Sequence, residues 1–209
     1  MKIEKLNKEN IKEFINDMKL DYTENLEHSI NKIELYGVKK DDVFLMGFDS
    51  SSLVDTIAIL HYSPKLSTDL FYECIDFLNR SLVVQNRLII DIFDDKHMKL
   101  MDEKFRCKEM EVVLELSDGS YAYSNDRTNV KEKFIDIEMN SIKYNYFNGN
   151  TSCNFVKQNI TDEKLILDLH NYFANLDVDY ISYTIYEDSY EYLQSLGYKI
   201  LCKRYVIKN

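Results

Sequence analysis

Apolar residues recur along the chain at the spacing of amphipathic helices in four segments. The first follows a short alternating strand over Lys2–Leu6, where apolar residues fall at i, i+3, i+4 and i+7: Ile11, Phe14, Ile15 and Met18. A second helix is predicted over Asn25–Tyr36, with Gly37 as the left-handed residue that ends it. The third begins near Thr68 and the fourth at Thr161, each with its apolar residues along one side.

Extended segments lie between these helices. The runs Asp42–Asp49 and Leu53–Tyr62 are apolar and are joined by a short polar loop, which predicts a β-hairpin. Two more extended runs are expected over Phe134–Phe147 and Thr151–Lys157. Helices and strands therefore follow one another along the whole chain.

A strand–helix–strand pattern occurs twice, at a constant offset of 93 residues and without a gap. It covers Arg87–Leu114 and then Tyr180–Ile207, and an acidic pair precedes the short helix each time: Asp94-Asp95 and Glu187-Asp188. Repetition of such a unit predicts two related halves. The alternative is two unrelated pieces that share an apolar rhythm because both pack on a sheet.

The polar stretch Ser117–Lys133 is the expected connector between the halves. It lacks apolar periodicity and contains the turn signal Asp118-Gly119-Ser120. We therefore expect an N-terminal unit over residues 1–119 and a partial second copy over residues 120–209. The predicted fold class is α+β, with a mixed, mostly antiparallel sheet flanked by helices.

Composition excludes several classes of protein. With 209 residues, 45% of them apolar, the chain is long enough to bury a core, and its net charge of −10 argues against a nucleic-acid partner. No segment has the roughly 18 uncharged apolar residues of a membrane span, and the first ten residues lack the apolar core of a signal peptide. We expect a cytoplasmic protein with no membrane partner.

The cysteines and histidines do not follow a metal-binding spacing. The four cysteines are far apart and no C-x-x-C occurs, and the four histidines form neither H-x-x-x-H nor H-E-x-x-H. We therefore expect free buried thiols, no disulfide and no metal site.

The segment Ile181–Ile207 resembles the last strand–helix–strand of the GNAT superfamily, which comprises acetyl-CoA-dependent N-acetyltransferases. In that family the short helix ends in Leu-Gly-Phe or Leu-Gly-Tyr before a final strand, and Leu196-Gly197-Tyr198 matches this ending. The element order of the first two thirds of the chain is similar too. The resemblance implies a GNAT-like fold in tandem, acetyl-CoA as co-substrate, and a primary amine of a small molecule or peptide as acceptor.

The glycine-rich phosphate loop of the family is absent from both halves. The stretches that take its place, Ser63–Thr68 and Lys157–Thr161, still put backbone N–H groups and a lysine at the start of a helix. The resemblance therefore implies eight cofactor-binding candidates: Lys65, Leu66, Ser67, Thr68, Gln158, Asn159, Ile160 and Thr161. Ordinary helix capping is the alternative for all of them.

Two residues are catalytic candidates. Many family members place a tyrosine general acid where this chain has Leu100 and Leu193, so the neighbouring Tyr192 is the candidate acid. His61, at the end of a predicted strand, is the candidate base, although a structural histidine is the simpler interpretation. The acidic pairs either cap their helices or attract a cationic amine.

Three functions are therefore open. The first is an N-acetyltransferase in which two parallel strands separate to admit the pantetheine arm. The second is a GNAT-like binding or regulatory module without turnover. The third is an oligomeric interaction protein, such as a homodimer, that uses the aromatic run Tyr144–Phe147. These aromatics are otherwise expected in the sheet core.

Overall fold

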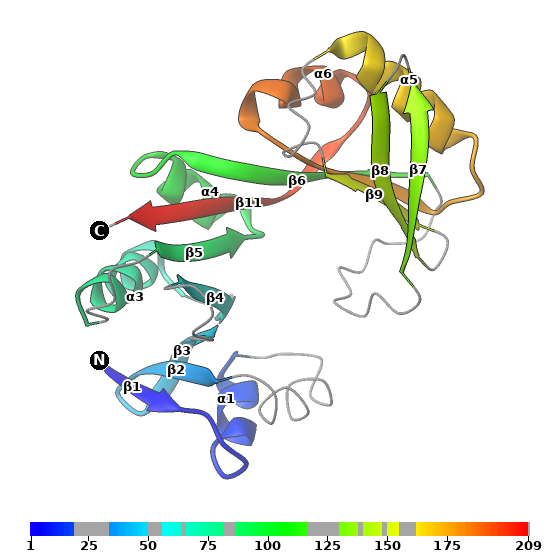
Figure 1. The fold of residues 1–209 in the computed structure, drawn as a ribbon. Coiled ribbons are helices and arrows are strands. Elements are labelled where there is room, and N and C mark those ends of the chain that lie inside the picture. The colour runs from blue at the N-terminus through cyan, green and yellow to red at the C-terminus, as the bar shows by residue number, and fades with distance from the viewer. Residues whose placement is uncertain are drawn as a thin grey trace. The chain divides into compact units, whose positions relative to one another are not determined.

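The chain forms two compact units in the computed structural model (Figure 1). The structure describes residues 1–18, 34–49, 56–63, 66–81, 87–116, 130–137, 140–147, 150–154 and 162–208. Unit 1 comprises Met1–Arg106 with Arg204–Asn209, and unit 2 comprises Cys107–Lys203. The expected boundary near residue 120 lies outside the described residues. No helix in the described part of the chain is long and apolar enough to cross a membrane.

Unit 1 is a mixed sheet with helices. Its strands are hydrogen-bonded in the order β1 (Lys2–Lys5), β2 (Leu35–Lys40), β3 (Val43–Asp49), β4 (Thr56–Tyr62), β5 (Arg87–Ile92) and the C-terminal part of β11 (Lys199–Lys208). Its helices are α1 (Ile11–Met18), α3 (Thr68–Ser81) and α4 (Asp95–Asp102). The first four strands are antiparallel, which confirms the hairpin predicted for β3 and β4, and β5 runs parallel to β4.

The first predicted helix is confirmed, and its four apolar residues are buried. Phe14 of α1 meets the ring of Phe44 on β3 edge-on, with centroids 5.3 Å apart. A Cβ atom on Gly47 would lie 2.5 Å from Cζ of Phe14. Glycine at this position therefore lets the helix approach the strand.

The predicted helix over Asn25–Tyr36 is wrong at its C-terminal end. Leu35 and Tyr36 lie in β2, and Gly37 is inside that strand, paired with Glu4 on one side and Gly47 on the other. A Cβ atom on Gly37 would overlap the ring of Phe44. This glycine therefore makes room for a neighbouring aromatic side chain and does not end a helix.

Unit 2 contains the remaining strands and helices. Its strands are hydrogen-bonded in the order β11, β6 (Cys107–Glu115), β10 (Tyr180–Ile185), β9 (Asn150–Asn154), β8 (Asn140–Phe147) and β7 (Lys131–Ile137). Its helices are α5 (Glu163–Ala174), the 3-10 turn η1 (Glu187–Ser189) and α6 (Tyr190–Ser195). The run Phe134–Phe147, expected as one extended segment, is an antiparallel hairpin of β7 and β8.

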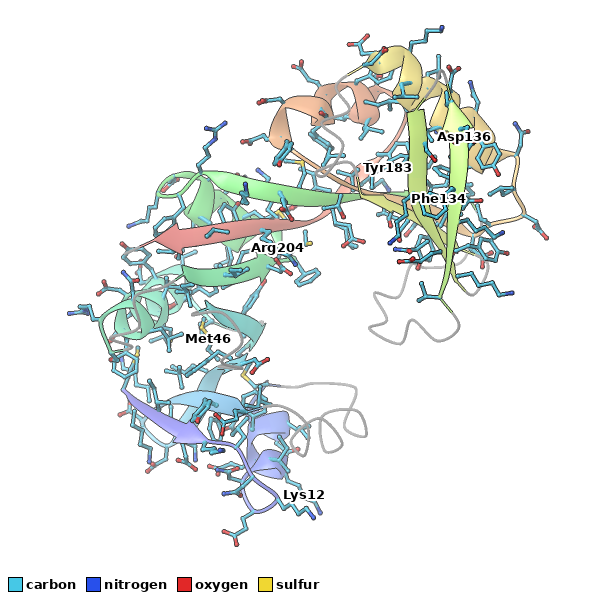
Figure 2. The ribbon with its side chains drawn as sticks, in the orientation of Figure 1. Lys12, Met46, Phe134, Asp136, Tyr183 and Arg204 are labelled. Atoms are coloured by element: carbon cyan, nitrogen blue, oxygen red, sulfur yellow. The ribbon has the colours of Figure 1, made fainter. Side chains whose placement is uncertain are left out.

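The 93-residue offset reappears in the element boundaries. β5 spans residues 87–92 and β10 spans 180–185, while α3 ends at Ser81 and α5 ends at Ala174. The last strand of each strand–helix–strand pattern lies in the unit that contains the other pattern. β6, which ends the first pattern, belongs to unit 2 and pairs with β10, and Arg204–Lys208, which end the second pattern, belong to unit 1. Within unit 1, Arg204 (Figure 2) donates two hydrogen bonds of 2.7 Å to Asp91 of β5.

The helix ending Leu196-Gly197-Tyr198 has the expected left-handed glycine. Gly197 has φ +94°, and its N–H donates to the carbonyl of Gln194 over 3.0 Å. The N–H of Tyr198 donates to the carbonyl of Leu193 over 3.1 Å. These two bonds form a Schellman motif, which satisfies the last carbonyls of α6.

Candidate functional site

Strands β4 and β5 pair over only part of their length. The pairs run from Thr56↔Arg87 to Ile59↔Ile90, yet β4 continues along β3 to Tyr62 and β5 continues to Ile92. On the β3 side, Gly47 faces His61 and Phe48 faces Ile59, so Leu60 is an extra residue in β4. Such a bulge bends its strand and increases its twist. The bulge therefore begins where β4 leaves β5.

The start of α3 follows directly after this point. Ser67 caps the helix, because its Oγ accepts the N–H of Leu70 over 3.2 Å. The N–H of Leu66 donates to the carbonyl of Ser63 over 3.0 Å. The side chain of Lys96, on helix α4, also lies here. Its Nζ donates a hydrogen bond to the carbonyl of Leu66 over 2.9 Å. An ammonium group thus lies beside the N-terminus of α3, where the helix dipole also favours an anion.

A hydrogen-bonded cluster connects the ends of β4 and β5. The hydroxyl of Tyr62, the last residue of β4, donates to Oδ2 of Asp94 over 2.7 Å and accepts the N–H of Phe93 over 3.2 Å. Asp94 caps α4 by accepting the N–H of His97 over 3.0 Å. Nδ1 of His97 lies 2.8 and 2.9 Å from the two carboxylate oxygens. Phe71 of α3 completes the cluster, with its ring centroid 4.4 Å from that of His97.

The protonation states follow from these contacts. Burial and the hydrogen bond to Asp94 raise the pKa of Tyr62 far above its ordinary value, so the phenol stays protonated. Burial alone would raise the pKa of Asp94, but the bonds donated by Tyr62 and His97 outweigh it, and the pKa lies below its ordinary value. Because a carboxylate only accepts, Nδ1 of His97 carries a hydrogen, and in the neutral ring the lone pair is therefore on Nε2.

The predicted site residues divide between the two units. In unit 1, Leu66 is buried, Ser67 is the cap and Thr68 opens α3, whereas Lys65 lies outside the described residues. His61 lies in β4 opposite Gly47, and its side chain is outside the described part. The candidates of the second half, Gln158, Asn159, Ile160 and Thr161, are also outside the described residues.

Tyr192 lies in unit 2, on α6. Its side chain is half-buried, and its carbonyl accepts the hydroxyl of Ser195 over 2.6 Å. The acidic pairs behave differently from each other. Asp94 caps its helix as expected, whereas η1 has no side-chain cap and Glu187 lies 3.8 Å from Nζ of Lys203.

Three residues of the cluster were missed in the sequence: Tyr62, Lys96 and His97. The only local signal was the three-residue spacing of Asp94 and His97, which puts both on the first turn of α4. Asp94 contacts Tyr62, and Lys96 contacts Leu66. In each pair the two residues are about 30 positions apart in the sequence. Spacing along a single sequence does not reveal such contacts.

Unit 2 lacks the corresponding features in its described part. β9 pairs with β10 over all of its five residues, from Asn150↔Tyr180 to Asn154↔Thr184. The start of α5 is acidic, because Asp162 caps it by accepting the N–H of Lys164 over 2.9 Å and Glu163 follows. These carboxylates repel a phosphate. Among the described residues, no group of three or more His, Cys, Asp or Glu side chains is placed to hold a metal ion.

No protein-family model and no curated protein matches the chain. Solved structures do match. A tandem GNAT protein from the clavulanic acid biosynthesis pathway has a TM-score of 0.48 at 8% identity, over 99% of this chain and 98% of that one. A GCN5-related N-acetyltransferase from Sphaerobacter thermophilus has a TM-score of 0.45 at 8% identity, over 98% and 93%.

An acetyltransferase of the GNAT family from Bacillus cereus has a TM-score of 0.37 at 13% identity, over 56% of this chain and 88% of that one. With every TM-score below 0.5, the function has to be argued from the chain's own geometry. Both of the structures named above that cover nearly the whole chain are described as GNAT or GCN5-related proteins, and one of them is a tandem protein.

Proposed function

We propose that this protein is an N-acetyltransferase that moves an acetyl group from acetyl-CoA to a primary amine, and that unit 1 holds the acetyl-CoA. The observation that carries the proposal is the divergence of β4 and β5 after Ile59 and Ile90. Strands that stop pairing leave backbone N–H and C=O groups to be satisfied by something else. The pantetheine arm of acetyl-CoA, with its two amides, can bind there as an added strand does.

The start of α3 supports the same placement of acetyl-CoA. The diphosphate of acetyl-CoA needs N–H donors and positive charge. The cap residue Ser67 and the ammonium group of Lys96 both lie at the N-terminus of α3. Asp69 in the first turn opposes an anion. The acidic start of α5 opposes it more strongly, because its cap is itself a carboxylate. Unit 1 is therefore the better candidate.

The chemistry required of the protein is limited. The amine nitrogen attacks the thioester carbonyl carbon, the C–S bond breaks, and CoA leaves as a thiolate that takes up a proton. The chain contributes by holding the thioester and the amine together and by polarising the carbonyl with backbone N–H groups. A base is also needed, because only a neutral amine attacks.

A binding module without turnover is the second candidate. It is favoured by two departures from the family's pattern: neither half has the glycine-rich phosphate loop, and Leu100 and Leu193 stand where many members have a tyrosine acid. The two candidates differ in CoA release. Both predict acetyl-CoA binding, but only the first predicts that free CoA accumulates when a panel of primary amines is added.

The third function has lost its main support. Tyr144 of the aromatic run is 3% exposed and packs on Phe173 of α5, with ring centroids 5.0 Å apart. It therefore belongs to the core of unit 2. Among the described residues, Phe134 on β7 is the most exposed large apolar side chain, at 66% (Figure 2), and the neighbouring lysines Lys131 and Lys133 disfavour edge-to-edge pairing.

The test is the thermal midpoint with and without millimolar acetyl-CoA, with acetate and adenosine bisphosphate as controls. A ligand that binds only the folded state at about 100 times its Kd adds ~2.7 kcal/mol. Lys96→Met should weaken acetyl-CoA binding about tenfold through loss of a charged hydrogen bond. Lys99→Met on the same helix is the matched control. No midpoint shift in the wild type, or equal weakening by both variants, would contradict the proposal.

A further inference from the structure

His97 has a buried nitrogen without a hydrogen-bond partner. The side chain is 1% exposed, and within the described part of the chain its Nε2 is one of three buried side-chain atoms for which no partner is found. Buried polar atoms are nearly always paired in folded proteins, and an exception calls for an explanation. Helix capping does not explain why Nε2 lacks a partner, because of the two ring nitrogens only Nδ1 contacts Asp94.

The contacts of the ring define its chemical state. Asp94 accepts from Nδ1, so in the neutral ring the hydrogen is on Nδ1 and the lone pair is on Nε2. The rings of Tyr62 and Phe71 lie against the imidazole, with centroids 5.4 and 4.4 Å away. A base oriented by a carboxylate through its other nitrogen is the arrangement that activates nucleophiles in many enzymes.

The position of this pair matches the proposed site. Asp94 follows β5 by two residues and is bonded to Tyr62, the last residue of β4, so the pair lies where the two strands separate. Asp94 and Tyr62 are bonded as described, and the ammonium of Lys96 is engaged with the carbonyl of Leu66.

We propose that His97 is the general base of the transfer, an inference that rests on the proposed acetyltransferase function. As the amine nitrogen bonds to the thioester carbon, its proton passes to Nε2, and the carboxylate of Asp94 stabilises the imidazolium. The imidazolium then gives this proton to the departing thiolate, so CoA leaves as the thiol and His97 is restored. Nε2 has almost no contact with solvent in the ligand-free chain, so the proposal requires that binding of acetyl-CoA and the amine opens access to it.

The test uses a conjugate whose binding does not depend on the natural acceptor. In this probe the CoA sulfur is joined through an acetyl bridge to butylamine, so an amide N–H occupies the place of the attacking nitrogen. The full chain, labelled with ¹⁵N in its histidine rings, is observed by long-range ¹H–¹⁵N spectroscopy. We expect the Nδ1–H tautomer for His97 in the free protein, and a shift of the Nε2 resonance with the conjugate but not with acetyl-CoA.

Two variants complete the test. His97→Gln should bind acetyl-CoA as the wild type does, but lose about 10²- to 10⁴-fold in the rate of amine acetylation. His170→Gln is the matched control, because His170 is bonded to Tyr198 in unit 2 and takes no part in the proposed reaction. If both ligands bind and the Nε2 resonance does not shift with the conjugate, His97 is not the base and the proposed function stands. The same conclusion holds if Nε2 is bonded only to water in the complex with the conjugate. If neither ligand binds, both proposals fail.

Discussion

Replacement of Asp94 by alanine should destabilise the protein through two separate losses. The carboxylate caps α4, and loss of such a cap costs about 0.5–2 kcal/mol. It is also the acceptor for Nδ1 of His97, which is 1% exposed, and an unsatisfied buried donor costs about 1–3 kcal/mol. Tyr62 also loses its acceptor, but the residue is only half-buried, so we assign most of the cost to the cap and to His97. The expected loss in unfolding free energy is therefore about 1.5–5 kcal/mol.

The variant Asp94→Asn keeps the cap and removes the charge. Its amide oxygen can still accept the backbone N–H of His97, since asparagine caps helices about as well as aspartate. The charge and one of the two acceptor oxygens are lost, because the amide nitrogen is a donor, and the expected cost is about 1 kcal/mol. Urea unfolding at pH 7, followed by circular dichroism, measures both variants, and the slope m should stay constant.

Asp95→Ala is the control for this prediction. Asp95 is adjacent, exposed and in the first turn of the same helix. Its replacement should change the unfolding free energy by less than about 0.5 kcal/mol. If Asp94→Ala costs no more than Asp95→Ala, Asp94 neither caps α4 nor serves as the acceptor for Nδ1 of His97.

Four further outcomes are expected. Gly47→Ala should cost about 1–3 kcal/mol in urea unfolding, because its methyl group meets Phe14, and a neutral effect would contradict that packing. Gly197→Ala should cost about 1–2 kcal/mol in the same assay, since alanine resists a positive φ. Tyr144→Glu should abolish folding by circular dichroism, because a charge enters the core of unit 2; a folded monomer in place of a folded dimer would instead restore the oligomer hypothesis. The stability difference between wild type and Asp94→Asn should be present above pH 3.8 and decline as pH falls through the lowered pKa of Asp94 in the folded chain; a difference that does not depend on pH would contradict the charge assignment.

Local periodicity predicted much of the fold. Helix α1 begins and ends where its four apolar residues required, and Ser67 caps α3, which was the alternative left open for this cofactor-binding candidate. Gly197 takes the left-handed position after α6. These features depend on residues that are neighbours along the chain, so a single sequence contains them.

The errors arose where a distant contact decided the structure. Gly37 was interpreted as the end of a helix, although it lies in β2 because Phe44 occupies the space of a side chain. Phe134–Phe147 was expected as one extended run, because the sequence between residues 134 and 147 contains neither glycine nor proline to mark a break. In both cases the sheet pairing overrides the local pattern.

The candidate site was less predictable than the fold. Asp94 was correctly expected to cap its helix, but its bonds to Tyr62 and to Nδ1 of His97 depend on the tertiary fold. His61 was chosen from its place at a strand end, and the neighbouring Tyr62 is the residue whose side chain reaches Asp94. The extra residue Leu60 also becomes visible only through the pairing with β3.

The central claim is that acetyl-CoA binds where β4 and β5 separate in unit 1. Backbone hydrogen exchange of the full chain, measured by mass spectrometry with and without acetyl-CoA, tests it most directly. The account predicts slower exchange in peptides that cover residues 60–69 and 91–97, and no change at 150–154 or 180–187. Protection confined to 150–187, or unchanged exchange throughout at a saturating concentration of acetyl-CoA, would contradict it.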